Sequence, residues 1–513
     1  MTDVKYTLSH RSLSEKQPLL GIPLAGKGNT LIIKLRNLST NTIAYYGGGE
    51  SLSGELGPSA TRKNYNLMSS HIPLLFNPYV ADSDTIEGGK NHFHLVYSPG
   101  TTDEVYSWGS NQYYQLGTGG KDSSGNNLVS KAEAPREISS GIVFSGSHRI
   151  RTINSGWDHT NIVTRSNRLI TWGRNEYGQL GLTEDLGGIS GVEPTEVSVT
   201  LSGNIFSTSA GEDFTVLLTD EGNVYAYGRN NKGQLTISAT PAVDFCENPI
   251  RIDISNVVDI YCGKDFALAL KSNSEVWGWG NNISGQITGI SSDDLYEPTY
   301  SNQDDVVYAS CGNKHSIFLK KKGTVKLHGD NTYFQSSEPS TNKEFTYCYA
   351  IQNNTVLSTL DGNIYIYGEG ISGTSSGSFL LQDASSRSFS STPLVPQTFI
   401  NLDTKNVFIS PTGGAYLNLV YDLVESLTEN LEDLPYQDED RIMTSQEYLE
   451  NQKSIAFLCE VERRTNSTRG SCEECAAALP TQIVIPSFKD HKELMMFQRG
   501  MLIKRKACLI KNS

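Results

Sequence analysis

Short apolar stretches alternate with polar, glycine-containing turns along most of the chain, and their apolar residues recur at every second position. The segments VYAYG at 224–228 and IYIYG at 364–368 are clear examples. A period of two is typical of β-strands with one buried face. Polar stretches such as DEGN at 220–223 and DGN at 361–363 indicate tight hairpin turns. The pattern therefore predicts an all-β chain of many short strands.

One strand-turn pattern recurs along the chain. An apolar and aromatic strand ends at a glycine, and the best copies then reach Gly-Gln-Leu, as in TWGRNEYGQL (171–180) and VYAYGRNNKGQL (224–235). A glycine here lets the backbone bulge or pass close to a neighbouring segment. The glycines of the seven copies are Gly47, Gly109, Gly173, Gly228, Gly280, Gly329 and Gly368.

A second pattern alternates with the first. It consists of a small residue, two mostly polar residues, then a ring or amide, followed by apolar alternation. The small residues are Gly89, Gly156, Gly211, Gly263, Gly312, Ala350 and Gly413. The ring or amide three positions later is His92, His159, Phe214, Phe266, His315, Asn353 or Tyr416. Because aromatic rings replace histidine so freely, we interpret these histidines as architectural rather than catalytic.

Prolines mark a third recurrent position, between each copy of the first pattern and the next copy of the second. They are Pro73, Pro135, Pro194, Pro249, Pro298, Pro339 and Pro393. Three signals in constant order predict seven units of about four strands each, which is the size of a propeller blade. One blade cannot bury both faces, but a ring of seven can. We expect ring closure to pair a strand near residues 31–35 with the last blade.

These motifs resemble the RCC1-like repeat family, the β-propellers named after the regulator of chromosome condensation. The shared signature is Val-Tyr-x-Trp-Gly-x-Asn-x-x-Gly-Gln-Leu, then Pro, then Gly-x-x-His-Thr, and it covers about residues 30–420. The resemblance implies an all-β, seven-bladed propeller with structural repeat residues. Those that match best are Gly109, Gly156, His159, Gly173, Gly228, Gly280, Gly312 and His315.

The resulting domain organisation has three parts. Residues 1–30 form an N-terminal segment, 31–420 the propeller and 421–513 a mostly helical extension, because the spacing of apolar residues changes near 421. A last helix over 488–510 is amphipathic and ends in basic residues. It has three possible roles: packing on the propeller, binding a groove of a partner protein, or contacting an anionic surface.

Composition narrows the functional classes. The 513 residues carry a net charge of −14, which disfavours direct nucleic-acid binding. The chain has no apolar run of membrane-spanning length, and its eight cysteines are scattered. We therefore expect an intracellular protein, cytoplasmic or nuclear, without a transmembrane segment.

Several motifs are candidates for chemistry, and each has a plainer explanation. Residues 21–28 have phosphate-loop spacing, but Gly28 replaces the hydroxyl residue that would bind Mg²⁺. Cys472 and Cys475 form a lone CxxC, whereas a zinc site needs four ligands; we favour a surface pair and leave metal binding there open. The Gly-Trp-x-His-Thr element at Trp157 is similar to one repeated in ultraviolet-sensing members of the family, but it occurs once here, which disfavours photoreception. We predict no cofactor, no metal and no catalytic residues.

The loops that follow the motif glycines vary while the frame stays constant, as in a recognition surface. Candidate partner-binding residues are Arg174, Glu176, Tyr177, Arg229 and Lys232. The resemblance implies two functions. We favour a non-enzymatic scaffold or regulatory subunit that binds protein partners. The alternative is a guanine-nucleotide exchange factor for a small, Ran-like GTPase; the loops at 50–70 and 117–134 do not read as the protruding hairpin that the family's exchange factor uses.

Overall fold

The computed structural model describes residues 85–359 with gaps at 98–101, 120–129, 139–140, 187, 189–190, 238–243 and 340–344. It also describes residues 24–25, 28, 30–37, 42–49, 53–55, 65–71, 364–368 and 407–409. The phosphate-loop-like segment as a whole, the Cys472–Cys475 pair and the predicted helical extension lie outside these residues.

The described strands form seven antiparallel sheets that follow one another along the chain. The first contains β1 (Leu24–Ala25), β2 (Thr30–Asn37), β3 (Thr42–Gly49) and β4 (Tyr65–His71). The second contains β5 (Thr85–Gly88), β6 (His92–Tyr97), β7 (Thr102–Ser110) and β8 (Lys131–Glu137), with β9 (Phe144–Ser145) paired to β7. A short 3-10 helix, η2 (Gly146–His148), leads into the third sheet.

Three regular four-stranded sheets come next. The third sheet contains β10 (Ile150–Ser155), β11 (His159–Thr164), β12 (Leu169–Gly173) and β13 (Val192–Val197). The fourth contains β14 (Ile205–Ala210), β15 (Phe214–Thr219), β16 (Val224–Arg229) and β17 (Phe245–Ile252). The fifth contains β18 (Val257–Cys262), β19 (Phe266–Lys271), β20 (Val276–Gly280) and β21 (Leu295–Gln303).

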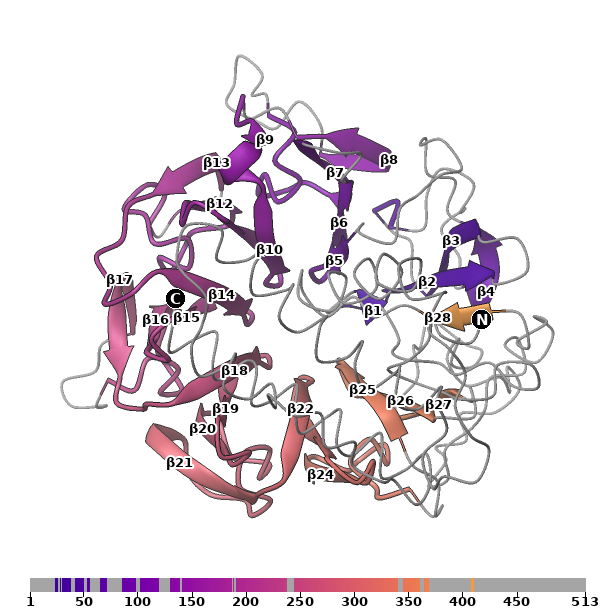
Figure 1. Ribbon diagram of the computed structural model, residues 1–513, viewed down its shortest axis with the longest axis vertical. Helices are drawn as coiled ribbons and strands as arrows, with labels where there is room; N and C mark the ends of the chain where they lie inside the picture. Colours follow the sequence, from indigo (N-terminus) through magenta and orange to yellow (C-terminus); the bar gives the residue numbers. More distant parts are fainter. Residues whose placement is uncertain are drawn as a thin grey trace, which may run out of the picture.

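The last two sheets have three strands each among the described residues. They contain β22 (Val306–Cys311), β23 (His315–Lys320) and β24 (Val325–Gly329), then β25 (Phe345–Ile351), β26 (Asn354–Thr359) and β27 (Ile364–Gly368). The sheets stand around a centre in sequence order, with first strands such as β10, β14 and β18 inside and fourth strands such as β17 and β21 outside (Figure 1). The seven-bladed, all-β propeller predicted from the repeats is confirmed.

The two ends of the repeat region meet in one sheet. Strand β28 (Val407–Ile409) pairs antiparallel with β2, through Leu35 with Ile409 and Asn37 with Val407. An N-terminal strand therefore does pair with a C-terminal one, as expected. The expected pairing was with the last blade. In the structure β28 instead adds to the first sheet, where β2 also pairs with β3.

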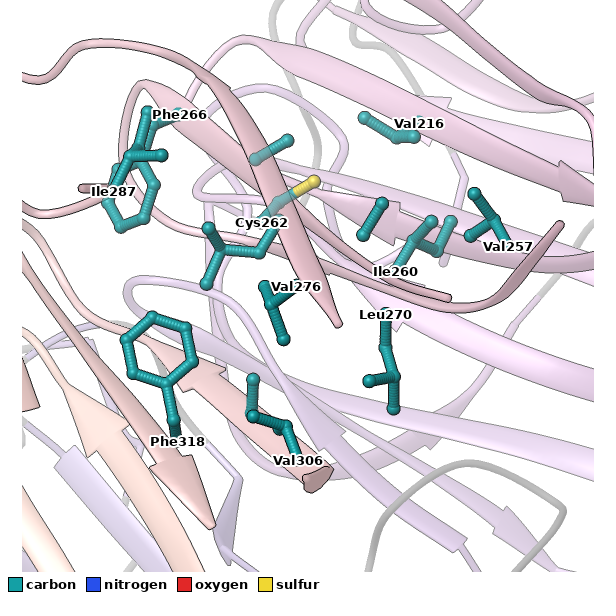
Figure 2. Packing of buried hydrophobic residues seen from close by; sticks show 14 of the residues in the cluster. Val216, Val257, Ile260, Cys262, Phe266, Leu270, Val276, Ile287, Val306 and Phe318 are labelled. Atoms are coloured by element: carbon teal, nitrogen blue, oxygen red, sulfur yellow. The ribbon is translucent and has the colours of Figure 1, made fainter. Parts of the chain in front are cut away.

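The hydrophobic core lies between neighbouring blades. Its largest cluster joins the fourth to the seventh sheet, and Figure 2 shows Val216, Phe266 and Phe318 contributing to it from β15, β19 and β23. A fully buried side chain of this size contributes about 1.5–3 kcal/mol. Because each blade packs on its neighbours, the blades support one another around the ring.

Four of the seven motif prolines lie in fourth strands. Pro135, Pro194, Pro249 and Pro298 fall within β8, β13, β17 and β21. A fourth strand lies at the edge of its sheet and has one side without a ladder partner, so a residue without an N–H is tolerated there. In the second to fifth blades the proline thus marks the outer edge of the sheet.

Candidate functional site

Two loops of each blade emerge at the same end of its sheet. His159, the first residue of β11, pairs with Gly173, the last of β12; Phe214 pairs with Gly228, and Phe266 with Gly280, in the same way. The inner loop before the second strand and the outer loop after the third strand therefore share one face. We call this the motif face; its inner loops include 156–158, 211–213 and 263–265, and its outer loops follow Gly173, Gly228 and Gly280.

The glycine of each inner loop makes room for a ring. A Cβ on Gly156 would lie 2.1 Å from Cε1 of His159 and 2.7 Å from the carbonyl oxygen of Gly211, and a Cβ on Gly211 would lie 2.0 Å from Cε1 of Phe214. Gly312 has the same relation to His315, at 2.4 Å. The ring therefore packs directly on the glycine backbone, and the motif requires a glycine there because a side chain would overlap the ring.

The motif histidine connects its blade to the next one. Nε2 of His159 lies 3.0 Å from Oγ1 of Thr215, and the Thr215 hydroxyl donates to the carbonyl of Gln179 at 2.9 Å. Further round the ring, His315 contacts Thr355 at 3.1 Å, and Thr355 donates to the carbonyl of Gln335. Each contact thus joins a histidine of one blade to a threonine of the following blade.

Where the ring is phenylalanine, the residue of the following blade changes with it. Phe214 is followed in the next blade by Ala267, and Phe266 by Ser316, at the positions that Thr215 and Thr355 occupy after a histidine. The Ser316 hydroxyl donates to the carbonyl of Gln286 at 2.7 Å. Ala267, after Phe214, offers no hydroxyl, whereas Ser316, after Phe266, keeps a hydroxyl that bonds to a carbonyl as those of Thr215 and Thr355 do.

Burial favours the neutral form of His315 and of His94. Burial lowers the pKa of His315 to about 4, and it also lowers the pKa of His94, which lies beside His92. His94 Nε2 contacts the Thr160 hydroxyl at 2.8 Å, and its Nδ1 contacts the Ser107 hydroxyl at 2.7 Å. A neutral imidazole can donate with one nitrogen and accept with the other.

The Trp-Gly and Gln residues of the outer-loop motif also join neighbouring blades. The indole N–H of Trp172 donates to the carbonyl of Gln115, and that of Trp279 donates to the carbonyl of Gln234, both at 2.9 Å. The side chain of Gln234 meanwhile accepts from the backbone N–H of Lys232 at 2.7 Å and holds its own turn. One motif therefore fixes the loop and docks the next blade.

The glycine after the aromatic residue takes a backbone conformation that other residues rarely adopt. Gly173 has φ +104°, and a Cβ there would lie 2.4 Å from the carbonyl oxygen of Asp158. The register between β12 and β13 shifts at this glycine. Gly109, Gly228 and Gly280 have φ values of +102°, +108° and +99°.

Four of the five candidate partner-binding residues lie together on the motif face. Asp213 is buried between Arg174 and Arg229, with N–O distances of 3.7 and 3.1 Å. The Arg229 guanidinium lies 4.5 Å from the centre of the Tyr177 ring, and Glu176 pairs with Arg174. Burial raises the pKa of Asp213, while the two guanidinium groups oppose that rise. Arg174, Glu176 and Tyr177 come from the third blade and Asp213 and Arg229 from the fourth, so the cluster joins these two blades.

Lys232, the fifth candidate, lies apart from that cluster. Its ammonium is 3.3 Å from a carboxylate oxygen of Asp294, in the following blade. Tyr113 joins the cluster instead, because the Arg174 guanidinium lies 5.2 Å from its ring centre. Tyr113 occupies the same motif position as Tyr177, a correspondence that was available in the sequence.

Sequence reasoning also missed a group on the inner loops. The Trp157 ring carries the ammonium of Lys90 at 4.4 Å and that of Lys264 at 4.9 Å, and Lys264 is 3.6 Å from Glu212. These four residues share the position after the motif glycine, so their grouping could have been found by aligning the copies. Backbone hydrogen bonds also join successive inner loops; for example, the Lys90 N–H donates to the Trp157 carbonyl at 2.9 Å. These bonds link the inner loops of neighbouring blades.

Two negative findings concern the described part of the chain alone. There, no group of three or more His, Cys, Asp or Glu side chains is placed to hold a metal ion. Nor does any helix within those residues have the length and hydropathy needed to cross a bilayer.

Comparisons with known proteins agree with the fold. The family model of the RCC1-like domain matches residues 43–370. The human (Homo sapiens) E3 ubiquitin-protein ligase HERC2 is 26% identical over 306 residues, which are 58% of this chain and 6% of HERC2. The secretion-regulating guanine nucleotide exchange factor of Bos taurus is 28% identical over 247 residues, 46% of this chain and 50% of that protein.

A solved structure shows the same architecture. Prp20p from Saccharomyces cerevisiae has a TM-score of 0.55 at 18% identity, covering 77% of this chain and 91% of that one. The chain spans half or less of the length of the two curated relatives. Since the family model matches more than half of its residues, and its repeats build the same ring of blades, the chain belongs to the RCC1-like domain family.

Proposed function

We propose that this chain is a non-enzymatic interaction propeller that binds a protein partner through its motif face. The observation that carries the proposal is the cluster of Arg174, Tyr177 and Arg229 across two successive blades. The buried Asp213 pairs with both arginines, and the Arg229 guanidinium lies over the Tyr177 ring. Each arginine side chain is a quarter to a third exposed, so it can still contact a partner.

Preorganisation is what makes this cluster suited to binding. Side chains already fixed by neighbours lose less conformational entropy when a partner docks. Arginine and tyrosine are also enriched where protein interfaces concentrate their binding energy. The frame beneath is rigid, because histidine, threonine, tryptophan and glutamine contacts join each blade to the next.

Exchange of guanine nucleotide on a small GTPase is the second candidate. It is supported by the bovine relative that is named as an exchange factor. Exchange requires a face that binds the nucleotide-free GTPase more tightly than the nucleotide-bound form, and it needs no catalytic side chain.

Affinity capture with the full chain tests the proposal and separates the two functions. Arg229→Gln and Tyr177→Ala are expected to reduce capture at least tenfold, while Lys322→Gln, an exposed lysine on the opposite end of its blade, retains it. A partner whose retention ignores GTP indicates scaffolding. A GTPase that is retained with EDTA and released by GTP indicates exchange. Equal capture by all variants contradicts the assignment of the motif face.

A further inference from the structure

In the outer loop of the fifth blade, the turn held by the motif asparagine contains one residue more than in the third and fourth blades. In the third blade the Asn175 amide donates to the carbonyl of Leu182, and in the fourth Asn230 donates to that of Ile237, each seven positions away. In the fifth blade Asn282 donates to the carbonyl of Ile290, eight positions away. The extra residue is Thr288, because Gly289, with φ +78°, matches Gly181 and Thr236, which precede Leu182 and Ile237 and have φ values of +74° and +56°.

The insertion changes where the apolar side chain goes. Leu182 and Ile237 are half-buried and pack against the apolar clusters between blades. Ile290, which occupies the corresponding place, is 70% exposed, and Ile283 in the same loop is 56% exposed. A Cβ on Gly285 would lie 2.9 Å from the backbone of Ile290, so the two parts of the loop are in contact.

The adjoining blade accommodates the insertion. His328 occupies the position in β24 that Trp172 and Trp279 occupy in β12 and β20. A Cβ on Gly289 would lie 3.0 Å from the His328 ring, so the glycine lies directly against it. A histidine ring thus meets the lengthened turn at the position where the third and fifth blades place a larger indole.

The loop is ordered although its isoleucines are exposed. The fully buried Asn282 side chain accepts from the N–H groups of Ile287 and Thr288 at 2.9 and 3.3 Å. Its amide also reaches the Ser292 hydroxyl at 2.7 Å, and the Thr288 hydroxyl donates to the Ile290 carbonyl at 2.8 Å. These hydrogen bonds hold the loop in a conformation that exposes both isoleucine side chains to water, which is energetically unfavourable.

Single exposed apolar residues are ordinary on protein surfaces, but a concentration on one loop indicates a contact site. Among the described residues, four large hydrophobic side chains are strongly exposed: Val143, Phe245, Ile283 and Ile290. Two of these belong to this one loop, and Phe245, which pairs with Arg229, is also at the motif face. Asp293, beside the isoleucines, is exposed and acidic.

We propose that Ile283 and Ile290 form a hydrophobic anchor that inserts into an apolar pocket of the protein partner, with a basic rim of that pocket facing Asp293. This inference rests on the proposed function and names the part of the motif face that supplies apolar contact. It also assigns a purpose to the inserted residue, Thr288, since Ile290 is exposed where the shorter turns bury their apolar residue.

The test uses the partner identified by capture, purified, and its dissociation constant for full-chain variants. Ile290→Ser and Ile283→Ser are expected to weaken binding at least tenfold. Val143→Ser, at 66% exposure on a connection at the opposite end of its blade, is the matched control and should change it less than twofold. Asp293→Lys should weaken binding most at low salt. Deletion of Thr288 should abolish binding while both isoleucines remain, with an unchanged or higher melting temperature.

The outcomes separate this inference from the proposed function. If Arg229→Gln weakens binding and neither isoleucine variant does, the anchor is wrong and the motif face stands. If no protein binds the motif face, both fail. Light scattering completes the test: should Ile290→Ser convert a dimer of this chain into monomers, the pocket belongs to a second copy and the proposed partner is overturned.

Discussion

Two separate constraints require a residue without a side chain at Gly173. Its positive φ is one constraint, and the nearby carbonyl of Asp158 is a second, independent one. Gly141 shares the first constraint, with φ +65°, but no atom lies within 4 Å of the place where its Cβ would stand. The two glycines therefore allow backbone strain to be separated from crowding.

We predict that Gly173→Ala destabilises the fold far more than Gly141→Ala. The positive φ should cost each variant about 1–2 kcal/mol. Crowding at Gly173 should add about 1–3 kcal/mol, because backbone atoms must move. Denaturant unfolding of both variants measures the difference, and equal losses contradict the interpretation.

His315 predicts a dependence of stability on pH at the same scale. Its pKa is about 4 in the folded state and 6.5 in the unfolded state, so the unfolded chain binds the proton first as pH falls. The lowered pKa of His315 therefore leaves the free energy of unfolding unchanged above about pH 6.5 and reduces it as the pH falls from about 6.5 to 4. The shift corresponds to about 3 kcal/mol. The free energy of unfolding, measured from pH 7.5 to 4.5, should fall less in His315→Phe than in the wild type.

At the scale of elements, the pairing of residues across a blade boundary matters more than either residue. Two kinds of pair occur at the blade boundaries of this chain: histidine with threonine, as in His159 and Thr215, and phenylalanine with alanine, as in Phe214 and Ala267. The sequence contains this correspondence. It becomes visible only when the ring residue of one repeat is compared with the threonine position of the next repeat.

A double-mutant cycle at His315 and Thr355 tests that matching. Thr355→Ala alone leaves a buried imidazole nitrogen without its hydroxyl partner, which should cost about 1–3 kcal/mol. Combining it with His315→Phe recreates the pair of Phe214 and Ala267. The double variant should be more stable than the sum of the single losses predicts, by about 0.5–3 kcal/mol. Strict additivity would show that the two positions are independent.

On the scale of the whole molecule, the pairing of β2 with β28 joins segments from opposite ends of the repeat region. We predict that removal of residues 1–40 lowers the melting temperature, because it removes β1 and β2 from the first sheet. Removal of residues 1–20 is the control and leaves every described strand in place. A shortened chain that melts like the intact one contradicts ring closure through β2.

Sequence patterns predicted the number of repeats and their short strands, because these depend on local period and turn chemistry. The clustering of Arg174 with Tyr177 and Arg229 depended on contacts between blades, so only a three-dimensional arrangement could reveal it. The exposure of Ile290 was hidden for another reason: one inserted residue in the turn accompanies the exposure of a side chain that packs inward in other blades. The domain boundaries at residues 30 and 420 stay predictions.

The contacts between histidine and threonine, and between tryptophan and glutamine, have a direction: each blade offers one set of groups forward and receives another from behind. A blade is therefore a link with two unlike ends. Exchanging the third and fifth blades would place His92 before Ala267, which has no hydroxyl, and Phe214 before Thr160, whose hydroxyl contacts His92 in the native order. The order of the blades is therefore constrained by the residues that meet at each boundary.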